Sequence, residues 1–516
     1  MLLHEFLERS SERFPDKTAL VCGDKRYSFG EIEEAANRLA NALIDLGLLR
    51  GDRAAIFAQP SVEAVASIFA VLKAGGSFIV INPQVKLNKL EYILRDCGAK
   101  VLVTDSLLSK TARPVLNTDG LPLRVVVPAD GSRSLQRHLR PKLPVIPYSS
   151  ILKDYPSKRP ARRSIDLDLA GLIYTSGSTG FPKGVMLTHL NMISAARSII
   201  EYLENTSDDI VLNLLPLSFD YGLYQVLMAF GFGGTVIQGS SFSYPYQALE
   251  LMVKEKVTGF PIVPAMAAMI LRMRNLDRFN FQSLRYITNT AQALPSSHIR
   301  GLQKIFPLAR IYSMYGLTEC KRATYLPPEE LSLRPTSVGK AIPNTEAYIV
   351  DERGNRIAEA GRIGELVVRG SHVMKGYWNL PEETSRALRP GPLPGERVLY
   401  TGDLFKMDEE GFLYFVARKD EMIKVSGFLV SPKEIENALT EIPGVREAAV
   451  IGVEDRITGQ AVKAFVVLKS GSLLEPDDIR RLSARYLESY TVPKQVEIRK
   501  SLPKNIHGKI SKKDLS

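Results

Sequence analysis

A loop at residues 174–184, YTSGSTGFPKG, has the composition of a phosphate-binding segment. It follows an apolar run, its hydroxyl groups can donate to phosphate oxygens, and its glycines let backbone N–H groups approach an anion closely. A flexible surface loop is the alternative, and the spacing is not that of a GK[ST] phosphate loop. The order of the residues favours a phosphate cradle made of Thr175, Ser176, Gly177, Ser178, Thr179, Gly180 and Lys183.

The elements around this loop are expected to be those of an α/β protein. Apolar runs rich in Val and Ile alternate with helical patterns over the first four hundred residues, which predicts parallel sheets with helical crossovers. The predicted strands include residues 54–57, 78–81, 101–103, 125–127 and 169–174. Apolar residues between 192 and 203 recur at helical spacing, so a strand–loop–helix arrangement is expected around the loop.

The character of the chain changes near Asp403. Residues 409–411 predict a hairpin turn, and a compact α+β unit follows. Its first helix is predicted at residues 432–440, with Ser431 as N-cap. Strands at 448–453, 461–468 and 495–499 and a second helix at 477–487 complete the unit. We therefore expect two domains, 1–419 and 420–516.

Composition excludes several classes of function. The net charge of +11 is spread along the 516 residues, and its densest cluster, residues 158–163, contains prolines and is typical of a solvated surface connection, which argues against nucleic-acid binding. No apolar run reaches the length of a membrane span, and the first residues predict an amphipathic helix rather than a signal peptide. Three widely spaced cysteines, Cys22, Cys97 and Cys320, favour a reducing cytoplasm over a zinc or disulfide framework.

Further motifs follow in the chain: LKAGGSFIVINP (72–83), YSMYGLTEC (312–320), GELVVRGSHVMKGYW (364–378), YTGDL (400–404), ARKDEMIKVSG (417–427) and LPKNIHGKI (502–510). Together with the loop, they resemble the adenylate-forming superfamily of acyl-CoA synthetases, nonribosomal peptide synthetase adenylation domains and luciferases. The resemblance covers nearly the whole chain. It implies a large N-terminal domain of stacked, mostly parallel sheets with helices and a small β-barrel-like part, followed by a small mobile α+β lid. It also implies a ligase that activates a carboxylic acid with ATP, forms an acyl-adenylate and releases pyrophosphate.

The same resemblance assigns roles at the nucleotide. Thr318 and Glu319 would lie beside the phosphates, and Glu319 would hold Mg²⁺, a hard cation that prefers oxygen ligands. Tyr315 would stack on the adenine. Asp403 would accept hydrogen bonds from the ribose hydroxyls, and Arg418 would assist at the ribose or the phosphates. Read alone, each of these residues could be a turn residue or a salt-bridge partner.

The C-terminal motifs resemble those of the mobile lid. Lys509, in GKI, would bridge the carboxylate and the α-phosphate, whereas the other lysines of this tail are expected to be solvated. The lid would turn about a hinge at Asp420 to reach a thioester-forming state. Gly427 would then line the channel for a pantetheine thiol, and Lys424 belongs to the same cofactor-binding set.

The acid pocket is expected around LPLSFDYGLYQ. Asp220 stands where many aryl- and acyl-CoA synthetases carry His and where amino-acid-activating domains carry Asp, so it could pair with a substrate ammonium. A structural cap or an ion-pair partner is the alternative. Arg322 could neutralise Asp220, recognise a second carboxylate of the substrate, or point outward into solvent. The pocket positions inferred from the resemblance are Asp220, Tyr221, Tyr224, Ile262, Asn289, Met314, Arg322 and Ala323.

The leading hypothesis is a ligase that loads an amino acid or small polar acid onto the phosphopantetheine thiol of a separate carrier protein. No carrier domain is expected in the chain, which ends at Ser516 shortly after the lysine motif. The alternative is an acyl-CoA synthetase that joins a fatty or aryl acid to free coenzyme A. A third hypothesis, a non-catalytic protein that retains the fold, is disfavoured by the presence of Lys509, Glu319 and Asp403.

Overall fold

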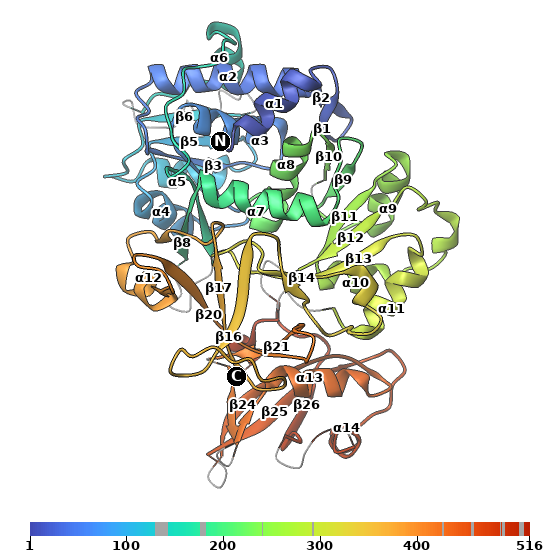
Figure 1. Cartoon of the computed structure of the whole chain (residues 1–516). Helices are drawn as coiled ribbons and strands as arrows, with labels where there is room; N and C mark the ends of the chain where they lie inside the picture. Colours follow the sequence, from blue (N-terminus) through green and yellow to red (C-terminus); the bar gives the residue numbers. More distant parts are fainter. Residues whose placement is uncertain are drawn as a thin grey trace.

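The computed structural model in Figure 1 shows a large part built on two sheets and their helices, a β-rich part below it, and a small α+β part at the opposite end. The residues described are 1–129, 143–175, 182–239, 241–290, 294–419, 421–425, 428–455, 459–485, 487, 491–504 and 510–515. Within them, no helix combines the length and apolar character that a membrane crossing needs.

The first sheet carries the two strands that flank the phosphate loop. Its strand order is β18-β8-β7-β4-β3-β5-β6. The strands are β3 (Arg53–Phe57), β4 (Ser77–Val80), β5 (Val101–Thr104), β6 (Val125–Pro128), β7 (Leu169–Thr175), β8 (Lys183–Thr188) and β18 (Gly376–Tyr377). Pairing is parallel from β7 to β6, which confirms the buried strands predicted from the Val- and Ile-rich runs. The helices of this region are α1 (Glu5–Arg13), α2 (Phe29–Asp45), α3 (Val62–Lys73), α4 (Leu87–Asp96), α5 (Ser109–Leu116) and α6 (Tyr148–Asp154).

The helix expected from the apolar residues between 192 and 203 is confirmed, but a strand that was not predicted, β8, lies between the loop and this helix. β8 pairs antiparallel with β7, with Lys183 opposite Thr175. Val185 and Leu187 alternate into the core, a period that suits a strand rather than a helix. The helix α7 (His189–Tyr202) begins only after Thr188, whose side chain accepts a hydrogen bond from the Asn191 backbone N–H in a reciprocal cap.

The second sheet forms the other half of the large part. Its order is β15-β14-β13-β12-β11-β9-β10-β1-β2. The strands are β1 (Thr18–Cys22), β2 (Lys25–Ser28), β9 (Ile210–Asn213), β10 (Thr235–Gln238), β11 (Gly259–Ile262), β12 (Tyr286–Asn289), β13 (Arg310–Tyr315), β14 (Thr324–Leu326) and β15 (Lys340–Ala341). From β1 to β13 the pairing is parallel, so the carboxyl ends of these strands share one edge. The helices are α8 (Asp220–Phe232), α9 (Pro245–Lys254), α10 (Pro264–Ile270) and α11 (Ser296–Ile305).

A β-rich part connects the large part to the small C-terminal part (Figure 1). It contains β16 (Thr345–Val350), β17 (Gly364–Gly370), α12 (Pro381–Ala387), β19 (Leu388–Pro390), β20 (Arg397–Met407) and β21 (Leu413–Arg418). β20 and β21 pair antiparallel, and Gly411 in their connection has φ +81°, which confirms the predicted hairpin turn.

The C-terminal part is the predicted α+β unit. Its elements are β22 (Ile423–Val425), β23 (Phe428–Val430), α13 (Pro432–Glu441), β24 (Val445–Asp455), β25 (Gly459–Leu468), α14 (Pro476–Ser483) and β26 (Gln495–Ile498). Ser431 caps α13 by accepting from the Glu434 backbone N–H, as predicted, whereas α14 ends four residues before the predicted Leu487. Its core packs Ile435 and Leu439 of α13 against the sheet of β24 and β25.

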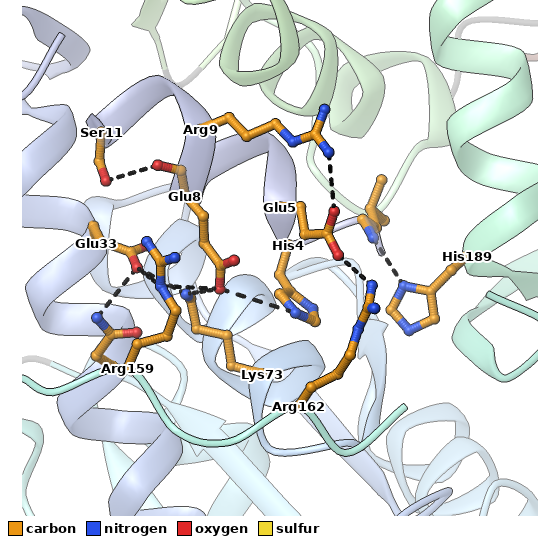
Figure 2. A network of polar contacts seen from close by, with 12 residues as sticks. His4, Glu5, Glu8, Arg9, Ser11, Glu33, Lys73, Arg159, Arg162 and His189 are labelled. Atoms are coloured by element: carbon orange, nitrogen blue, oxygen red, sulfur yellow. Dashed lines mark hydrogen bonds and ion pairs between the residues drawn. The ribbon is translucent and has the colours of Figure 1, made fainter. Parts of the chain in front are cut away.

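A buried ion-pair network joins the first three helices (Figure 2). Lys73 of α3 is 3% exposed, and its Nζ lies 2.5 Å from Glu8 Oε1 of α1 and 2.9 Å from Glu33 Oε1 of α2. Arg159 Nε lies 3.3 Å from the same Glu33 oxygen. Burial, assisted by the Lys73 charge, lowers the pKa of His4 to about 2, so this imidazole stays neutral. Two carboxylates and two cations therefore compensate one another.

The basic segment at 158–163 lies at the surface, as predicted, but two of its arginines, Arg159 and Arg162, are ion-paired instead of simply solvated (Figure 2). Arg159 Nη1 lies 2.9 Å from Glu12, and Arg162 Nη2 lies 2.5 Å from Glu5. The Asn41 amide of α2 also donates to the backbone carbonyls of residues 156 and 158, at 2.9 Å each. The segment is thus bound to α1 and α2 through both backbone and side chains.

Candidate active site

The carboxyl edge of the second sheet gathers the predicted pocket residues together with Tyr315, Thr318 and Glu319. The strands β9, β11, β12 and β13 end at Asn213, Ile262, Asn289 and Tyr315. Their parallel pairing places these ends at one edge, which is where open parallel sheets bind ligands. Asp220 begins the helix that follows β9, and the turn after β13 carries Thr318 and Glu319.

Tyr315, Asp403 and Arg418 form one cluster. The Tyr315 hydroxyl donates to Asp403 Oδ2 at 2.5 Å, and Arg418 Nη1 lies 3.1 Å from Asp403 Oδ1. Asp403 and Arg418 are direct partners across the β20–β21 ladder, so the hairpin holds the ion pair. Burial, followed by the Asp403 charge, raises the pKa of Tyr315 well above its ordinary value, so the hydroxyl keeps its proton. Three residues that are distant in the sequence are thereby brought together.

Glu319, Tyr377 and Lys183 form a second cluster. The Tyr377 hydroxyl donates to Glu319 Oε1 at 2.7 Å, and Lys183 Nζ lies 5.6 Å from the centre of the Tyr377 ring. β18 pairs with β8, with Tyr377 opposite Val185, so Tyr377 links the strand that follows the phosphate loop to the turn after β13. Burial and the Glu319 charge raise the pKa of Tyr377, so it remains a donor. Tyr377 was not among the predicted site residues, although it lies in the quoted motif GELVVRGSHVMKGYW.

The donor set around Glu319 suits Mg²⁺ only in company with phosphates. The described residues contain no group of three His, Cys, Asp or Glu side chains that could hold a metal by themselves. Mg²⁺ commonly takes one or two carboxylates and completes its shell with waters and substrate phosphate oxygens. A single carboxylate beside the base of a phosphate loop therefore fits a cation that arrives with ATP.

The turn that carries Thr318 and Glu319 is tightly folded. A Cβ on Gly316 would lie 2.4 Å from the Lys321 carbonyl oxygen, so only glycine fits that position. The Glu319 carbonyl accepts from the Met374 backbone N–H at 2.7 Å, and the Ala323 N–H returns to the Tyr315 carbonyl. These backbone bonds orient Glu319 toward β18.

Several predicted site residues lie outside the described residues: Ser176, Gly177, Ser178, Thr179, Gly180, Gly427 and Lys509, with the predicted hinge Asp420. Thr175 and Lys183, which flank the loop, are partners in the β7–β8 ladder. The backbone of Lys424 lies on β22, opposite Leu429 of β23. Their assigned roles stay predictions.

Asp220 is engaged by a lysine of the same chain. Lys321 Nζ lies 3.3 Å from Asp220 Oδ2, and it also lies 4.5 Å from the centre of the Tyr224 ring and 5.3 Å from that of Tyr221. Both Asp220 and Lys321 are buried. Burial lowers the pKa of Lys321 to about 7, although Asp220 acts in the opposite direction. Lys321 was not among the predicted pocket residues, because a basic residue in a polar turn ordinarily indicates a solvated side chain.

Arg322 points inward, so the solvated alternative is wrong, and neutralisation of Asp220 falls to Lys321. Arg322 Nη1 donates to Thr290 Oγ1 at 2.5 Å, and the guanidinium lies 5.3 Å from the centre of the Tyr221 ring. Tyr221 is held in turn by its hydroxyl, which lies 2.6 Å from Thr288 Oγ1. The other predicted pocket positions are buried at the same edge: Tyr224, Ile262, Asn289, Met314 and Ala323.

The lysines around the predicted Lys509 motif are paired, not solvated as expected. Lys512 Nζ lies 2.8 Å from Glu436 of α13 and 3.4 Å from Glu421, and these partners raise its pKa against the effect of burial. Lys504 Nζ lies 2.8 Å from Glu447. Lys504 and Ile510 also form an antiparallel bridge. Both flanks of the motif are therefore anchored to the C-terminal part.

Two family models match the chain. The one described as AMP-binding enzyme matches residues 7–378, and the one described as AMP-binding enzyme C-terminal domain matches residues 434–509. A long-chain-fatty-acid–CoA ligase of Bacillus subtilis is 34% identical and aligns with 99% of this chain and 94% of its own length. A 4-coumarate–CoA ligase of Narcissus pseudonarcissus is 28% identical, over 99% and 93% of the two chains. ATP-bound MatB from Rhodopseudomonas palustris superposes with a TM-score of 0.88 at 29% identity. The superposition covers 100% of this chain and 98% of the MatB chain. These similarities agree with the predicted α/β fold and its separate C-terminal domain.

Proposed function

Because the chain belongs to the AMP-binding enzyme family and is an AMP-forming acid–thiol ligase, we propose that it joins a fatty or aryl acid to free coenzyme A. The observation that carries this proposal is the buried Asp220–Lys321 pair. An amino acid would need Asp220 for its ammonium group, and Lys321 already occupies that carboxylate. The names of the relatives, a fatty-acid ligase and a 4-coumarate ligase, support the same choice over an amino acid carried on a separate carrier protein.

The first half-reaction joins the acid to AMP. The acid carboxylate attacks the α-phosphorus of ATP, the bond to the β-phosphate oxygen breaks, and pyrophosphate leaves. We assign Asp403 and Arg418 to the ribose, and Tyr315 to the adenine against which its ring would stack. Lys183 and Glu319 are assigned to the phosphates, with Thr318 beside them. Mg²⁺ held by Glu319 would neutralise the charge of the leaving pyrophosphate.

The second half-reaction transfers the acyl group to the coenzyme A thiol and releases AMP. We assign Lys509 to the first half-reaction, where its charge would offset the repulsion between the carboxylate and the α-phosphate. The anchoring of Lys504 and Lys512 to Glu447 and Glu436 supports movement of this motif together with the C-terminal domain. We place the boundary between the two domains at residue 420.

An exchange panel tests the proposal. ATP–pyrophosphate exchange is measured with straight-chain fatty acids, aryl acids and amino acids, and acyl-CoA formation is then measured with coenzyme A alone. We expect exchange with a fatty or aryl acid and steady release of acyl-CoA without any protein acceptor. Exchange restricted to amino acids, or transfer that needs a carrier protein, would refute the proposal.

A further inference from the structure

Arg322 carries a charge that its surroundings compensate only in part. Its side chain is 2% exposed, Nη1 donates to Thr290 Oγ1 at 2.5 Å, and the guanidinium also hydrogen-bonds to the Tyr202 side chain, so its described partners are neutral hydroxyl groups. Its Nε has no hydrogen-bond partner among the described residues. An arginine keeps its proton at any physiological pH, so it cannot avoid the penalty of burial by becoming neutral.

Asp220, the carboxylate at this end of the site, already has Lys321 as its ion-pair partner. Asp220 pairs with Lys321 at 3.3 Å, and no carboxylate of the described residues lies within ion-pair distance of Arg322. Arg322 also helps burial to lower the pKa of Lys321, because two cations share the field of one carboxylate. While Lys321 carries its proton, the group of Asp220, Lys321 and Arg322 therefore holds one surplus positive charge in the interior, and once Lys321 loses its proton the Arg322 charge is balanced only by a carboxylate that pairs with Lys321.

The backbone is strained to hold these two basic side chains inside. Lys321 has φ +57°, in the left-handed region that a residue with a Cβ adopts at a cost. The close approach of Gly316 to the Lys321 carbonyl fixes the turn in this shape. As a result Lys321 extends to the tyrosines of α8, and Arg322 extends to the end of β12.

Arg322 lies on the acid side of the site. Thr290, which accepts its hydrogen bond, directly follows the last residue of β12 at the carboxyl edge, and Tyr221 is on α8. Glu319, three residues earlier in the same turn, contacts Tyr377 of β18 on the phosphate-loop side. An acid whose reacting carboxylate lies near Glu319 could thus extend its other end toward Arg322.

We propose that Arg322 binds a second acidic group of the substrate, so that the chain activates one carboxyl of a dicarboxylic acid and leaves the other free. This inference rests on the proposed coenzyme A ligase function and narrows its acid to an aryl or acyl dicarboxylic acid. A guanidinium and a carboxylate form short, charge-assisted hydrogen bonds, and the unused Nε is one of the donors that such a pair needs. The bound carboxylate would pair directly with the buried Arg322 charge and would cancel the surplus that exists while Lys321 is protonated, which an alkyl or unsubstituted aryl end cannot do.

Matched pairs of acids test this on the unmodified protein. ATP–pyrophosphate exchange is measured with adipate against hexanoate, and with terephthalate against benzoate, and hydroxyhexanoate serves as an uncharged polar analogue. We expect kcat/KM for the dicarboxylate to exceed that of its partner by about tenfold to a hundredfold, the range of a charge-assisted hydrogen-bonded pair. A preference for the monocarboxylates, or equal rates with the hydroxy acid and the dicarboxylate, would overturn the inference.

Variants assign the preference to one side chain. In R322M, kcat/KM for the dicarboxylate should fall to about the value for its monocarboxylate partner. In R322K the ratio of the two kcat/KM values should be intermediate, because a lysine lacks the bidentate fork. Arg310→Met is the matched control, since Arg310 lies on β13 with its side chain 47% exposed. In R310M the ratio of kcat/KM for the dicarboxylate to that for the monocarboxylate should equal the ratio in the unmodified protein. An unchanged ratio in R322M would contradict the role of Arg322.

A failure of the proposed function gives a different result from a failure of this inference. If no acid supports exchange, the ligase proposal fails, and binding is then followed by thermal melting with adipate and hexanoate. A rise in Tm with adipate in the unmodified protein and in R310M, but not in R322M, supports recognition of the second carboxylate. Equal shifts in all three proteins, or no shift in any, overturn it.

Discussion

The buried amine of Lys321 should make the stability of the large domain depend on pH, and the variant Lys321→Met removes this dependence. Burial lowers the pKa of Lys321 from 10.5 to about 7 in the folded chain. Between these two values the unfolded chain binds the proton and the folded chain does not. The free energy of unfolding therefore rises with pH between about 7 and 10.5. This contribution is fully present above pH 10.5, and it has been lost once pH has fallen through the folded-state pKa of about 7.

The size of the effect follows from the same shift. One pKa unit corresponds to about 1.4 kcal/mol, so the displacement from 10.5 to about 7 corresponds to about 5 kcal/mol over the whole window. In K321M the remaining Asp220 carboxylate is buried without its partner, which costs about 3–5 kcal/mol. The free-energy difference between the unmodified protein and K321M should grow in favour of the former by about 1.4 kcal/mol per pH unit above about pH 7.

Urea unfolding followed by circular dichroism at about pH 6, 7, 8 and 9 measures this difference. The control is Lys304→Met, because Lys304 is exposed on α11 and should leave the pH profile parallel to that of the unmodified protein. A free-energy difference between the unmodified protein and K321M that stays constant over this range would refute the account of Lys321 as a buried amine that has lost its proton.

The remaining predictions concern the nucleotide site, the lid and the buried network. Asp403→Asn should raise the KM for ATP by about tenfold or more, since a charged acceptor is lost, whereas Asp408→Asn in the β20–β21 turn should leave it unchanged in the same exchange assay. Tyr377→Phe frees the carboxylate that its hydroxyl contacts and should change the Mg²⁺ dependence of exchange while kcat at saturating metal changes less. Lys509→Ala should abolish adenylate formation but spare thioester formation from supplied acyl-adenylate; equal loss of both would contradict the two-state lid. Lys73→Met should lower the free energy of unfolding by about 3–5 kcal/mol in urea, with an unchanged KM for ATP.

The sheets were predictable because their strands carry a local signal. Runs such as residues 101–103 and 125–127 are apolar and β-branched throughout, as strands buried on both faces must be. The strand at residues 183–188 was not predicted, because its alternation is short and it runs directly into the α7 helix. There, the cap at Thr188 decides the boundary, and a helical period alone does not locate it.

The environment of Asp220, Lys321 and Arg322 was not predictable from local sequence. Lys321 and Arg322 stand side by side in a turn, where basic residues are ordinarily solvated. Their burial depends on α8 and the end of β12, which lie far away in the chain and meet the turn only through the sheet. The choice of Lys321 over Arg322 as the partner of Asp220 depends on the left-handed backbone at Lys321, which no pattern of residue types reveals.

The network of Glu8, Glu33, Lys73 and Arg159 has a consequence for how this region can vary. Each member is balanced by the others, so replacing any one of them leaves an uncompensated charge next to apolar packing. A single substitution at any of the four positions should then destabilise the fold. A joint replacement of Lys73 and its carboxylate partners by apolar residues of similar volume should cost much less stability. The four positions should therefore change together in evolution. Related sequences should carry either a fully charged or a fully apolar version of this helix junction, with few intermediates.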